Sequence, residues 1–239
     1  ETSVETSDVY IISVPTPLDS SLNIPDLNAV KSATEMIGPH LSEDDLIILE
    51  STVPPATSEN LILPILEKYN GGEDFYLAHS PERAIPGNMI EEMRSNSRII
   101  GGLDGKSAEI AKSVYSSFVN GDIHLTDIKT AEMVKLMENT FRDVNIALAN
   151  EFAQISEEMG IDAWEAIDLA NEHPRVDILN PGPGVGGHCI SIDPWFLSSN
   201  STTSKMISLA REINDSMPNF VVNKAREIVD DVTDPTITI

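Results

Sequence analysis

One short stretch of this sequence, residues 180–196, combines a glycine-rich run with a possible nucleophile. It reads NPGPGVGGHCISIDPWF and contains Cys189, the only cysteine of the chain. Read literally, Gly182, Gly184 and Gly187 match G-x-G-x-x-G, the pattern of a turn that lets a pyrophosphate approach the backbone. The alternative is a loop whose irregular backbone presents the Cys189 thiol to a substrate.

The surroundings of this glycine run argue against dinucleotide binding. Such a turn must follow a strand, open a helix and precede an acidic residue about 20 positions further on. Here the glycines run into HCISIDPWF, where Ile190, Ile192 and Pro194 disfavour an immediate helix, and the later segment ISLARE has a helical pattern. We therefore expect a loop that presents Cys189.

Two other interpretations of the cysteine have to be weighed. A lone cysteine is most often an ordinary buried thiol, whereas His188 beside Cys189 suggests a cysteine hydrolase. Adjacent side chains of an extended loop point apart, and such hydrolases take their histidine from elsewhere in the chain, so a hydrolase is disfavoured. With five scattered histidines and one cysteine, we expect no structural metal site, and an intrachain disulfide is excluded.

The charge balance limits the partners of the protein. Fifteen Lys and Arg stand against 39 Asp and Glu, a net charge of −24, which repels nucleic acid and anionic lipid surfaces. Hydrophobic residues make up 41% of the 239 positions, enough for a sizeable core, and no apolar run approaches the ~20 residues that span a bilayer. We expect a cytoplasmic protein without a nucleic-acid or membrane partner.

Short β-rich runs alternate with helical stretches up to about residue 125, which is typical of a parallel sheet with crossover helices. The candidate helices cover residues 25–39, 54–69 and 106–119, with Pro54-Pro55 in a first helical turn and Gly71-Gly72 as a stop signal. The candidate strands are Val9–Val14, Leu46–Glu50, Phe75–His79, Arg98–Gly102 and Asp122–Leu125.

One long amphipathic helix is predicted over residues 127–159, because apolar residues recur there every three or four positions. Gly160 ends it, and Asp162 with Glu165 resembles a capping box that opens a helix over 163–170. A last helical region over 205–231 is expected to break at Pro218. The long helix has more apolar surface than one sheet can cover, which predicts a homodimer through it.

Ordered segments over nearly the whole chain resemble the UDP-glucose/GDP-mannose dehydrogenase family, and within it the branch that acts on UDP-N-acetyl-D-mannosamine. They are SVPTPLD at 13–19, ESTVPPAT at 50–57, HSPERAIPGN at 79–88, TAEMVKLMENTFRDVNIALANE at 130–151 and the cysteine loop with its preceding NEHPRV. The resemblance implies an α/β fold: a partial NAD-binding Rossmann-type domain (1–126), then an all-helical central and dimerisation domain similar to the C-terminal domain of 6-phosphogluconate dehydrogenase (127–217). Residues 218–239 would begin a nucleotide-sugar-binding domain.

The resemblance also implies parts that this sequence does not contain. In the family, a first strand with a glycine-rich turn precedes the VPTP segment, and another α/β domain follows the last helix. Between Glu1 and Ile239 neither is found. We therefore expect a fragment, which could be catalytically silent by itself and keep only the dimerisation core.

The implied activity is the NAD-dependent oxidation of a UDP-N-acetylhexosamine, UDP-N-acetyl-D-mannosamine, at C6 to the uronic acid. Cys189 matches the family's nucleophile, which forms a thiohemiacetal and then a thioester. Lys135 and Asn139, at i and i+4 on one helix face, match residues that stabilise oxyanions, and Asp193 would hold or deprotonate a water. From the residues alone, the first two could be a solvated polar pair and Asp193 a cap beside Pro194.

The resemblance assigns further residues to the hydrolytic water and the substrate. Glu82 matches the glutamate that helps activate this water, and Thr52 matches the threonine that orders it. Arg83 and His188 are expected at the substrate. Arg175 matches an arginine that reaches the sugar of a neighbouring subunit, although an ion pair on an acidic surface would explain it equally.

Val14, Pro15, Thr16, Ser51 and Thr52 follow predicted strands and are expected to border the NAD cofactor, since α/β sheets bind ligands at the carboxyl ends of their strands. The UDP-glucose enzymes carry a second glutamate where this sequence has Pro86. This departure favours an N-acetylhexosamine over glucose, and a relative specific for UDP-glucose or GDP-mannose is the alternative. The epimer depends on the shape of the pocket.

Overall fold

The protein was analysed as a computed structural model, which describes residues 4–19, 23–71, 74–85, 87–199, 201–233 and 235–238. The chain forms two compact units. The first comprises residues 1–138 and 195–200, and the second comprises residues 139–194 and 201–239. The long helix therefore contributes its first third to one unit and the remainder to the other.

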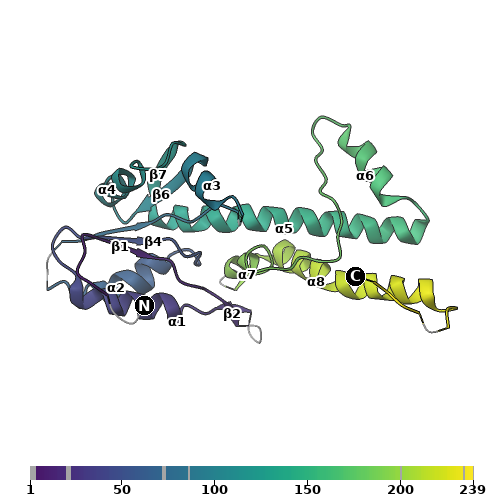
Figure 1. Ribbon diagram of the computed structural model, residues 1–239, viewed down its shortest axis with the longest axis horizontal. Helices are drawn as coiled ribbons and strands as arrows, with labels where there is room; N and C mark the ends of the chain where they lie inside the picture. Colours follow the sequence, from purple (N-terminus) through teal and green to yellow (C-terminus); the bar gives the residue numbers. More distant parts are fainter. Residues whose placement is uncertain are drawn as a thin grey trace. The chain divides into compact units, whose positions relative to one another are not determined.

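The first unit contains a five-stranded sheet in the order β1-β4-β5-β6-β7, of which β1, β4, β6 and β7 are labelled in Figure 1. β1 pairs with β4 and β4 with β5 in parallel. Every residue of β4 and β5 is buried, as expected of apolar strands that are covered on both faces. All five predicted strands are confirmed, with ends that shift by up to two residues: β1 Val9–Ile12, β4 Leu46–Leu49, β5 Tyr76–His79, β6 Arg98–Gly102 and β7 Ile123–Asp127.

The sheet is mainly parallel, and the exception is the pair β5 and β6. These two strands are antiparallel, whereas β6 and β7 are again parallel. The described residues between β5 and β6 (80–85 and 87–97) contain the short helix α3 (Met89–Ser95), which the sequence analysis missed, and β6 then runs alongside β5 in the opposite direction. A two-residue antiparallel pair, β2 (Leu18–Asp19) with β3 (Ile24–Pro25), lies outside this sheet.

Helices form in the first unit where they were predicted, although they are shorter. They are α1 (Asn28–Ile37), α4 (Gly105–Tyr115) and α2 (Leu63–Leu66), which a π-helical turn over Ser58–Ile62 precedes. Pro54 and Pro55 do not lie in the first helical turn as predicted, because Ala56 takes a φ of +72° and the helix starts only after it. Gly71 has a φ of +62°, and Gly72 lies outside the described residues.

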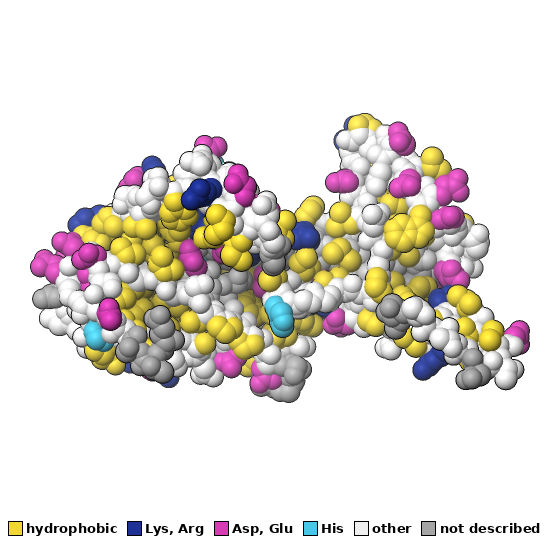
Figure 2. Space-filling view, viewed as in Figure 1, with side chains coloured by type: hydrophobic (Ala, Val, Ile, Leu, Met, Phe, Trp, Pro, Cys, Tyr) yellow, Lys and Arg dark blue, Asp and Glu magenta, His cyan; other side chains and the backbone are white. Residues whose placement is uncertain are grey.

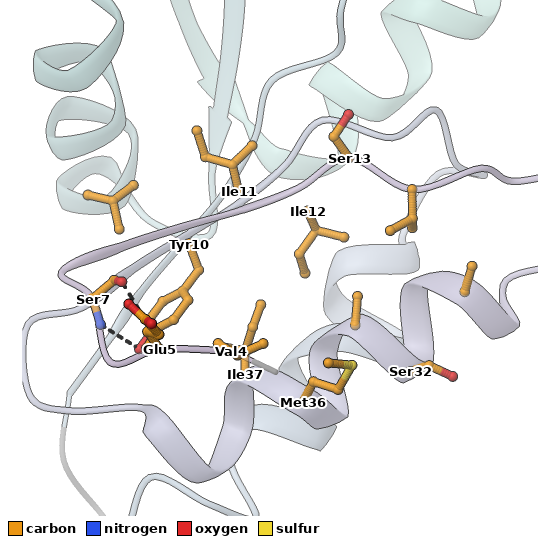
Figure 3. Close-up of a pocket in the computed structure, with 14 residues that line it drawn as sticks. Val4, Glu5, Ser7, Tyr10, Ile11, Ile12, Ser13, Ser32, Met36 and Ile37 are labelled. Carbon is orange, nitrogen blue, oxygen red and sulfur yellow. Dashed lines mark hydrogen bonds between the residues drawn. The ribbon is translucent and has the colours of Figure 1, made fainter. Parts of the chain in front are cut away.

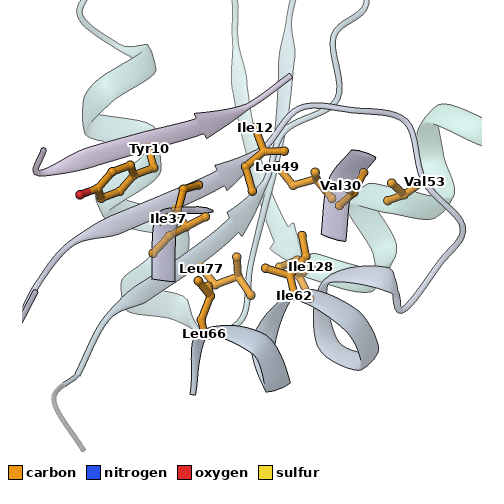
Figure 4. Close-up of a cluster of buried hydrophobic side chains, with 11 residues drawn as sticks. Tyr10, Ile12, Val30, Ile37, Leu49, Val53, Ile62, Leu66, Leu77 and Ile128 are labelled. Carbon is orange, nitrogen blue, oxygen red and sulfur yellow. The ribbon is translucent and has the colours of Figure 1, made fainter. Parts of the chain in front are cut away.

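Apolar side chains fill both faces of the sheet. On one face, Ile12 and Leu49 point toward Val30 of α1 and toward Ile62 and Leu66 (Figure 4). On the other face, a second cluster lies around α4. Its buried members are Leu46, Ile48, Tyr76, Ala78, Ile100, Ala111, Tyr115 and Val119.

The second unit is helical. α5 (Ile128–Met159) is a single helix of 32 residues, and α6 (Ala163–Asn171) and α8 (Lys205–Val229) follow. Gly160, with a φ of +70°, ends α5 as predicted. Asp162 caps α6 by accepting the Trp164 and Glu165 N–H groups at 2.9 and 3.2 Å. No helix within the described ranges is both long and apolar enough to cross a membrane.

The prediction that the last helix breaks at Pro218 is wrong, because α8 runs through it. Proline has no N–H group, so the Asn214 carbonyl loses its normal helical partner. Gly184 of the cysteine loop packs at this place: a Cβ atom added there would lie 3.1 Å from the Pro218 ring and 3.3 Å from the Asn214 carbonyl. The loop therefore packs against the turn of α8 in which Pro218 removes one helical hydrogen bond.

Candidate functional site

The predicted cofactor residues lie at the carboxyl ends of the neighbouring strands β1 and β4. The Ser51 hydroxyl accepts the Val14 N–H at 2.8 Å and donates to the Val14 carbonyl at 2.7 Å. The Thr16 hydroxyl donates to the Thr52 carbonyl at 2.8 Å, and Pro15 lies between these two connections. The structure thus brings these five residues together at the edge where parallel sheets bind ligands.

A cavity of about 1040 Å³ lies beside β1 and α1 (Figure 3). Ser13 and Val14 line it at the carboxyl end of β1, and Ser32, Ala33 and Met36 line it from α1. Its size is at the upper end of the range for small-molecule and cofactor sites. The strand-end residues fit a cofactor at this edge, whereas the cavity extends along β1 to Val9 and Val4, and of the predicted cofactor residues Val14 is the one that lines it.

Glu132 on α5 fixes the turn that follows Thr52, a role the sequence analysis missed. Its buried carboxylate accepts the Ala56 N–H at 2.5 Å and the Ser58 N–H at 2.8 Å. Burial raises the pKa of Glu132, and the hydrogen bonds from Ser58 and Ala56 oppose that shift. The available signal was its position seven residues before Asn139, which puts both polar groups on the same helix face.

Glu82 lies just after β5 and is held as an ionised carboxylate. One oxygen accepts the N–H groups of Arg83 and Ala84, each at 2.7 Å, and the other accepts the Arg98 guanidinium at 2.7 Å. Burial raises the pKa of Glu82, but the hydrogen bond from Ala84 and the charge and hydrogen bond of Arg98 outweigh it, so the pKa lies below its usual value of 4.5. Glu82 is therefore ionised at neutral pH and able to accept a hydrogen bond from water.

Arg98 is the second residue that the sequence analysis missed, since it was treated only as the start of a strand. It is 4% exposed, and its other guanidinium nitrogen lies 3.2 Å from the Ser80 hydroxyl and 3.5 Å from Glu50. Tyr115 lies under the guanidinium, 4.3 Å from ring centre to Cζ, and donates to Glu50 at 2.6 Å. The signal was an arginine at the start of the apolar strand RIIGG, where a charge needs buried partners.

Two other predicted site residues of the first unit are Arg83 and Lys135. Arg83 pairs with Glu138 at 2.7 Å and donates to the Ser97 carbonyl at 2.8 Å, and its side chain remains about one-third exposed. Lys135 is half-buried, and no carboxylate among the described residues of its unit lies within 4.0 Å of its ammonium. Pro86 lies outside the described residues.

His79, the last residue of β5, is buried with no hydrogen-bond partner for either ring nitrogen among the described residues. Burial lowers its pKa from 6.5 to about 3, although the nearby Leu49 backbone, which is outside hydrogen-bond geometry, opposes this shift. His79 is therefore a neutral ring at physiological pH. It belongs to the segment HSPER but was not predicted as a site residue.

In the second unit, the chain is irregular over residues 172–192, and its later part, the cysteine loop (residues 180–192), exposes both His188 and Cys189. The Cys189 carbonyl accepts the N–H groups of Ile192 and Asp193 at 3.0 and 2.8 Å, and this turn opens α7 (Asp193–Ser198). The loop follows no strand, and its helix starts well after Gly187, so the structure agrees with the rejection of a dinucleotide turn.

The structure brings together two of the predicted catalytic residues, Asn139 and Asp193. Both are buried, and the Asn139 amide donates to the Asp193 carboxylate at 2.5 Å. This bond joins α5 to the end of the cysteine loop across 54 positions of sequence. Arg175, by contrast, is exposed, and its backbone N–H donates to the His173 ring at 3.3 Å.

The chain matches two domain models of one protein family. Residues 1–119 match the NAD binding domain of the UDP-glucose/GDP-mannose dehydrogenase family, and residues 129–216 match its central domain. A UDP-N-acetyl-D-mannosamine dehydrogenase of Methanocaldococcus jannaschii is 57% identical over 96% of this chain and 53% of its own length. The chain spans about half the length of the curated relatives it matches.

Solved structures give the same result. The UDP-D-ManNAc dehydrogenase of Pyrococcus horikoshii superposes with a TM-score of 0.88 and is 48% identical, covering 94% of this chain and 54% of its own. The UDP-N-acetyl-mannosamine dehydrogenase Cap5O of Staphylococcus aureus superposes with a TM-score of 0.86 and is 46% identical, covering 98% of this chain and 56% of its own.

Proposed function

Because this chain belongs to the UDP-glucose/GDP-mannose dehydrogenase family, we propose that it carries the catalytic core of an NAD-dependent enzyme that oxidises UDP-N-acetyl-D-mannosamine at C6 to the uronic acid. The names of its relatives support this substrate. The observation that carries the proposal is the 2.5 Å bond from Asn139 to Asp193, because it ties the cysteine loop to the helix of Lys135. Residues 1–126 would form the cofactor domain, 127–217 the central domain and 218–239 the start of a nucleotide-sugar domain.

The first oxidation needs a base for the C6 hydroxyl. A water held by Asp193 and Lys135 takes the hydroxyl proton while C6 loses a hydride, which yields the aldehyde. One NAD would accept the hydride of each oxidation, so two are reduced per turnover, and Val14, Pro15, Thr16, Ser51 and Thr52 would border the bound cofactor at the strand ends.

The second oxidation uses the thiol. The Cys189 thiolate adds to the aldehyde carbon and forms a C–S bond, and the oxyanion is stabilised by the Lys135 ammonium and the Asn139 amide. Loss of a second hydride from this thiohemiacetal gives a thioester. The thiolate must remain reduced between turnovers, which is why we assign the enzyme to the cytoplasm.

Water then hydrolyses the thioester to the carboxylic acid and returns the Cys189 thiol. Glu82 takes part as the ionised group that accepts a proton from this water, and Thr52 orders the water. The lowered pKa of Glu82 keeps it in the accepting form. Arg83, His188 and Arg175 are assigned to the substrate, with Arg175 acting on a neighbouring subunit.

NADH formation tests the proposal. The purified protein is mixed with NAD and UDP-N-acetyl-D-mannosamine, with UDP-glucose and GDP-mannose as competing substrates, and NADH is followed by its absorbance. We expect two NADH for each uronate, and Cys189→Ser should lower uronate formation at least about a hundredfold. No NADH with any of these sugars would favour the silent fragment, and a preference for UDP-glucose or GDP-mannose would reassign the substrate.

We also propose a homodimer through α5. An apolar stripe on this helix is exposed, with Met137 at 54% and Phe141 at 68%, and it continues through Leu148, Phe152, Ile155 and Met159. Hydrophobic side chains lie among acidic ones on the face of the second unit in Figure 2. An exposed apolar stripe of this length is rare on a monomer.

Sedimentation equilibrium tests the dimer. Phe141→Asp should give a monomer at micromolar concentration, because a carboxylate would be buried in the interface without a partner. Arg142→Asp, an exposed position one step further round the same helix, is the control and should leave the dimer intact. A monomeric unsubstituted protein would contradict the proposal.

A further inference from the structure

The buried face of α5 carries a polar stripe that contacts both ends of the cysteine loop. Asn139, Asp143 and Asn150 are four and seven positions apart, so they project from one face of the helix. All three are buried. Asn139 holds the end of the loop through Asp193, and Asn150 holds its start, since its amide oxygen accepts the Gly182 N–H at 2.8 Å.

Asn150 is itself held by α8. Its amide nitrogen donates to the Asn214 oxygen at 2.8 Å. The Asn214 nitrogen in turn donates to the Asp143 carboxylate at 2.8 Å and to the Asp143 carbonyl at 3.0 Å. The same carboxylate oxygen accepts the Arg211 guanidinium at 2.5 Å. These four side chains form one chain of hydrogen bonds between the two helices.

The direction of each hydrogen bond in this chain follows from the charged pair. An ionised Asp143 only accepts hydrogen bonds, so the Asn214 amide must turn its nitrogen toward it. The Asn214 side-chain oxygen then faces Asn150 and accepts a hydrogen bond from the Asn150 amide nitrogen. That leaves the Asn150 oxygen for the loop, where the Gly182 N–H requires an acceptor.

The loop start is also shaped at a second place. Gly184 has a φ of +127° and lies against Pro218 and the Asn214 carbonyl, with no room for a larger side chain unless they shift. The loop therefore contacts α5 through Gly182 and α8 through Gly184, five residues before the thiol. These contacts define where the segment that carries Cys189 begins.

We infer that Asn150 is a positioning residue for Cys189: it fixes the start of the cysteine loop, in an orientation set by Asn214, Asp143 and Arg211, while Asn139 fixes the end. The functional half of this inference rests on the proposed role of Cys189 as nucleophile. Asn150 does not itself touch the reacting atoms. It acts by limiting the positions that the thiol can occupy, which is the contribution of orientation to the rate.

Hydrogen exchange on three variants tests the structural half. Asn150→Ala should accelerate amide exchange in residues 180–188 at least about tenfold, the loss expected for one well-made buried hydrogen bond, and leave α5 and α8 unchanged. Asn150→Asp keeps an acceptor for the Gly182 N–H, so its loop should exchange within about threefold of the unsubstituted rate, although stability falls because a carboxylate cannot donate to the Asn214 oxygen. Ala149→Gly, the buried neighbour, is the control: it loosens the helix by about 1 kcal/mol and keeps the hydrogen bond between Asn150 and Gly182.

Two exchange results would overturn the inference. One is a loop in Asn150→Ala that exchanges at the unsubstituted rate, or that speeds up only together with α5 and α8 as in Ala149→Gly. The other is an Asn150→Asp loop as fast as that of Asn150→Ala, because the acceptor would then not be what holds the segment.

Kinetics test the functional half. Asn150→Ala should lower kcat about tenfold or more with KM within about threefold, since the thiol is displaced but the binding groups are not, and Asn150→Asp should recover most of kcat. An unchanged kcat despite a loosened loop would overturn the positioning role. If the unsubstituted protein oxidises none of the sugars, the proposed function fails, and the exchange rates still decide whether Asn150 holds the loop.

Discussion

The segment of Glu82 and the segment of Cys189 are both irregular pieces of chain that begin where regular structure ends, yet they are held in different ways. Glu82 is held by a charge, the Arg98 guanidinium of the neighbouring strand, and by two N–H groups of its own segment. The cysteine loop is held by neutral amides, Asn150 at its start and Asn139 at its end. Its charged pair, Asp143 with Arg211, lies behind the amides and bonds to Asn214 and Asp215 of α8.

This difference follows from what each segment presents. A carboxylate that must remain ionised benefits from an adjacent guanidinium, which lowers its pKa. A loop that exposes a thiol needs its backbone fixed, and amides satisfy backbone groups without adding charge. We therefore expect substitutions near Glu82 to change its titration, and substitutions behind the cysteine loop to change stability and loop order.

The largest loss of stability should come from breaking the buried ion pair of Asp143 and Arg211 behind the cysteine loop. Asp143→Ala leaves Arg211, which is 1% exposed, without its buried partner and should lower the free energy of unfolding by about 3–5 kcal/mol. Asp215 also pairs with Arg211 but is largely exposed, so Asp215→Ala should cost less than about 1 kcal/mol. Urea denaturation measures both, and equal losses would mean that burial does not distinguish the two pairs.

The next effect concerns the charge that holds Glu82. Arg98→Met should cost about 3 kcal/mol, because it leaves Glu82 and Glu50 without their buried cation. The pKa of Glu82 should rise. In the unsubstituted protein this folded pKa is below the unfolded value of 4.5, so its contribution to stability is present above pH 4.5 and is lost as the pH falls through the folded pKa.

Urea denaturation between pH 3 and pH 6 should therefore show a weaker loss toward acid in Arg98→Met than in the unsubstituted protein. Arg83→Met removes a guanidinium whose pair with Glu138 is about one-third exposed, and it is the control. We expect this change to cost about 1 kcal/mol and to leave the titration of Glu82 close to its original form. If the free energy of unfolding fell equally between pH 6 and pH 3 in all three proteins, the role of Arg98 would be contradicted.

A third effect tests a neutral group at the end of β5. His79 has a pKa of about 3 in the folded protein and 6.5 in the unfolded chain. Between these two values the imidazole binds a proton in the unfolded state but not in the folded state. The contribution of the neutral His79 ring is fully present above pH 6.5, and its loss should lower the free energy of unfolding by about 2–3 kcal/mol at pH 4.5. Replacing His79 with Gln should flatten this part of the profile, whereas His124→Gln at an exposed position should not. An unaltered slope in the His79 variant would contradict the assignment.

The smallest effect concerns backbone strain in the turn held by Glu132. Ala56 has a φ of +72°, which a residue with a Cβ adopts at a cost. Ala56→Gly should therefore raise the free energy of unfolding by about 1 kcal/mol. Ala166→Gly in the exposed face of α6 should lower it by about 1 kcal/mol, and changes of the same sign would contradict the assignment of strain.

By itself, the sequence determined the elements of this protein and the identity of the groups that could do chemistry. The β-rich runs predict all five strands, and in β4 and β5 every residue is buried because both faces of these strands are covered. The three-to-four periodicity predicts α5, and Gly160 and Asp162 mark the turn after it. The single thiol of Cys189 is visible directly, since no pairing or packing is required to recognise it.

Only the tertiary structure decided which polar groups meet. Arg98 reaches Glu82 because two strands that are antiparallel to each other lie side by side, and no local pattern encodes that direction. Asn150 reaches Gly182, and Asn139 reaches Asp193, across 32 and 54 positions. Periodicity places these asparagines on one face of a helix, but only the packing of the loop and the helices excludes water from that face. Without water, each buried amide must form its hydrogen bonds with groups of the protein.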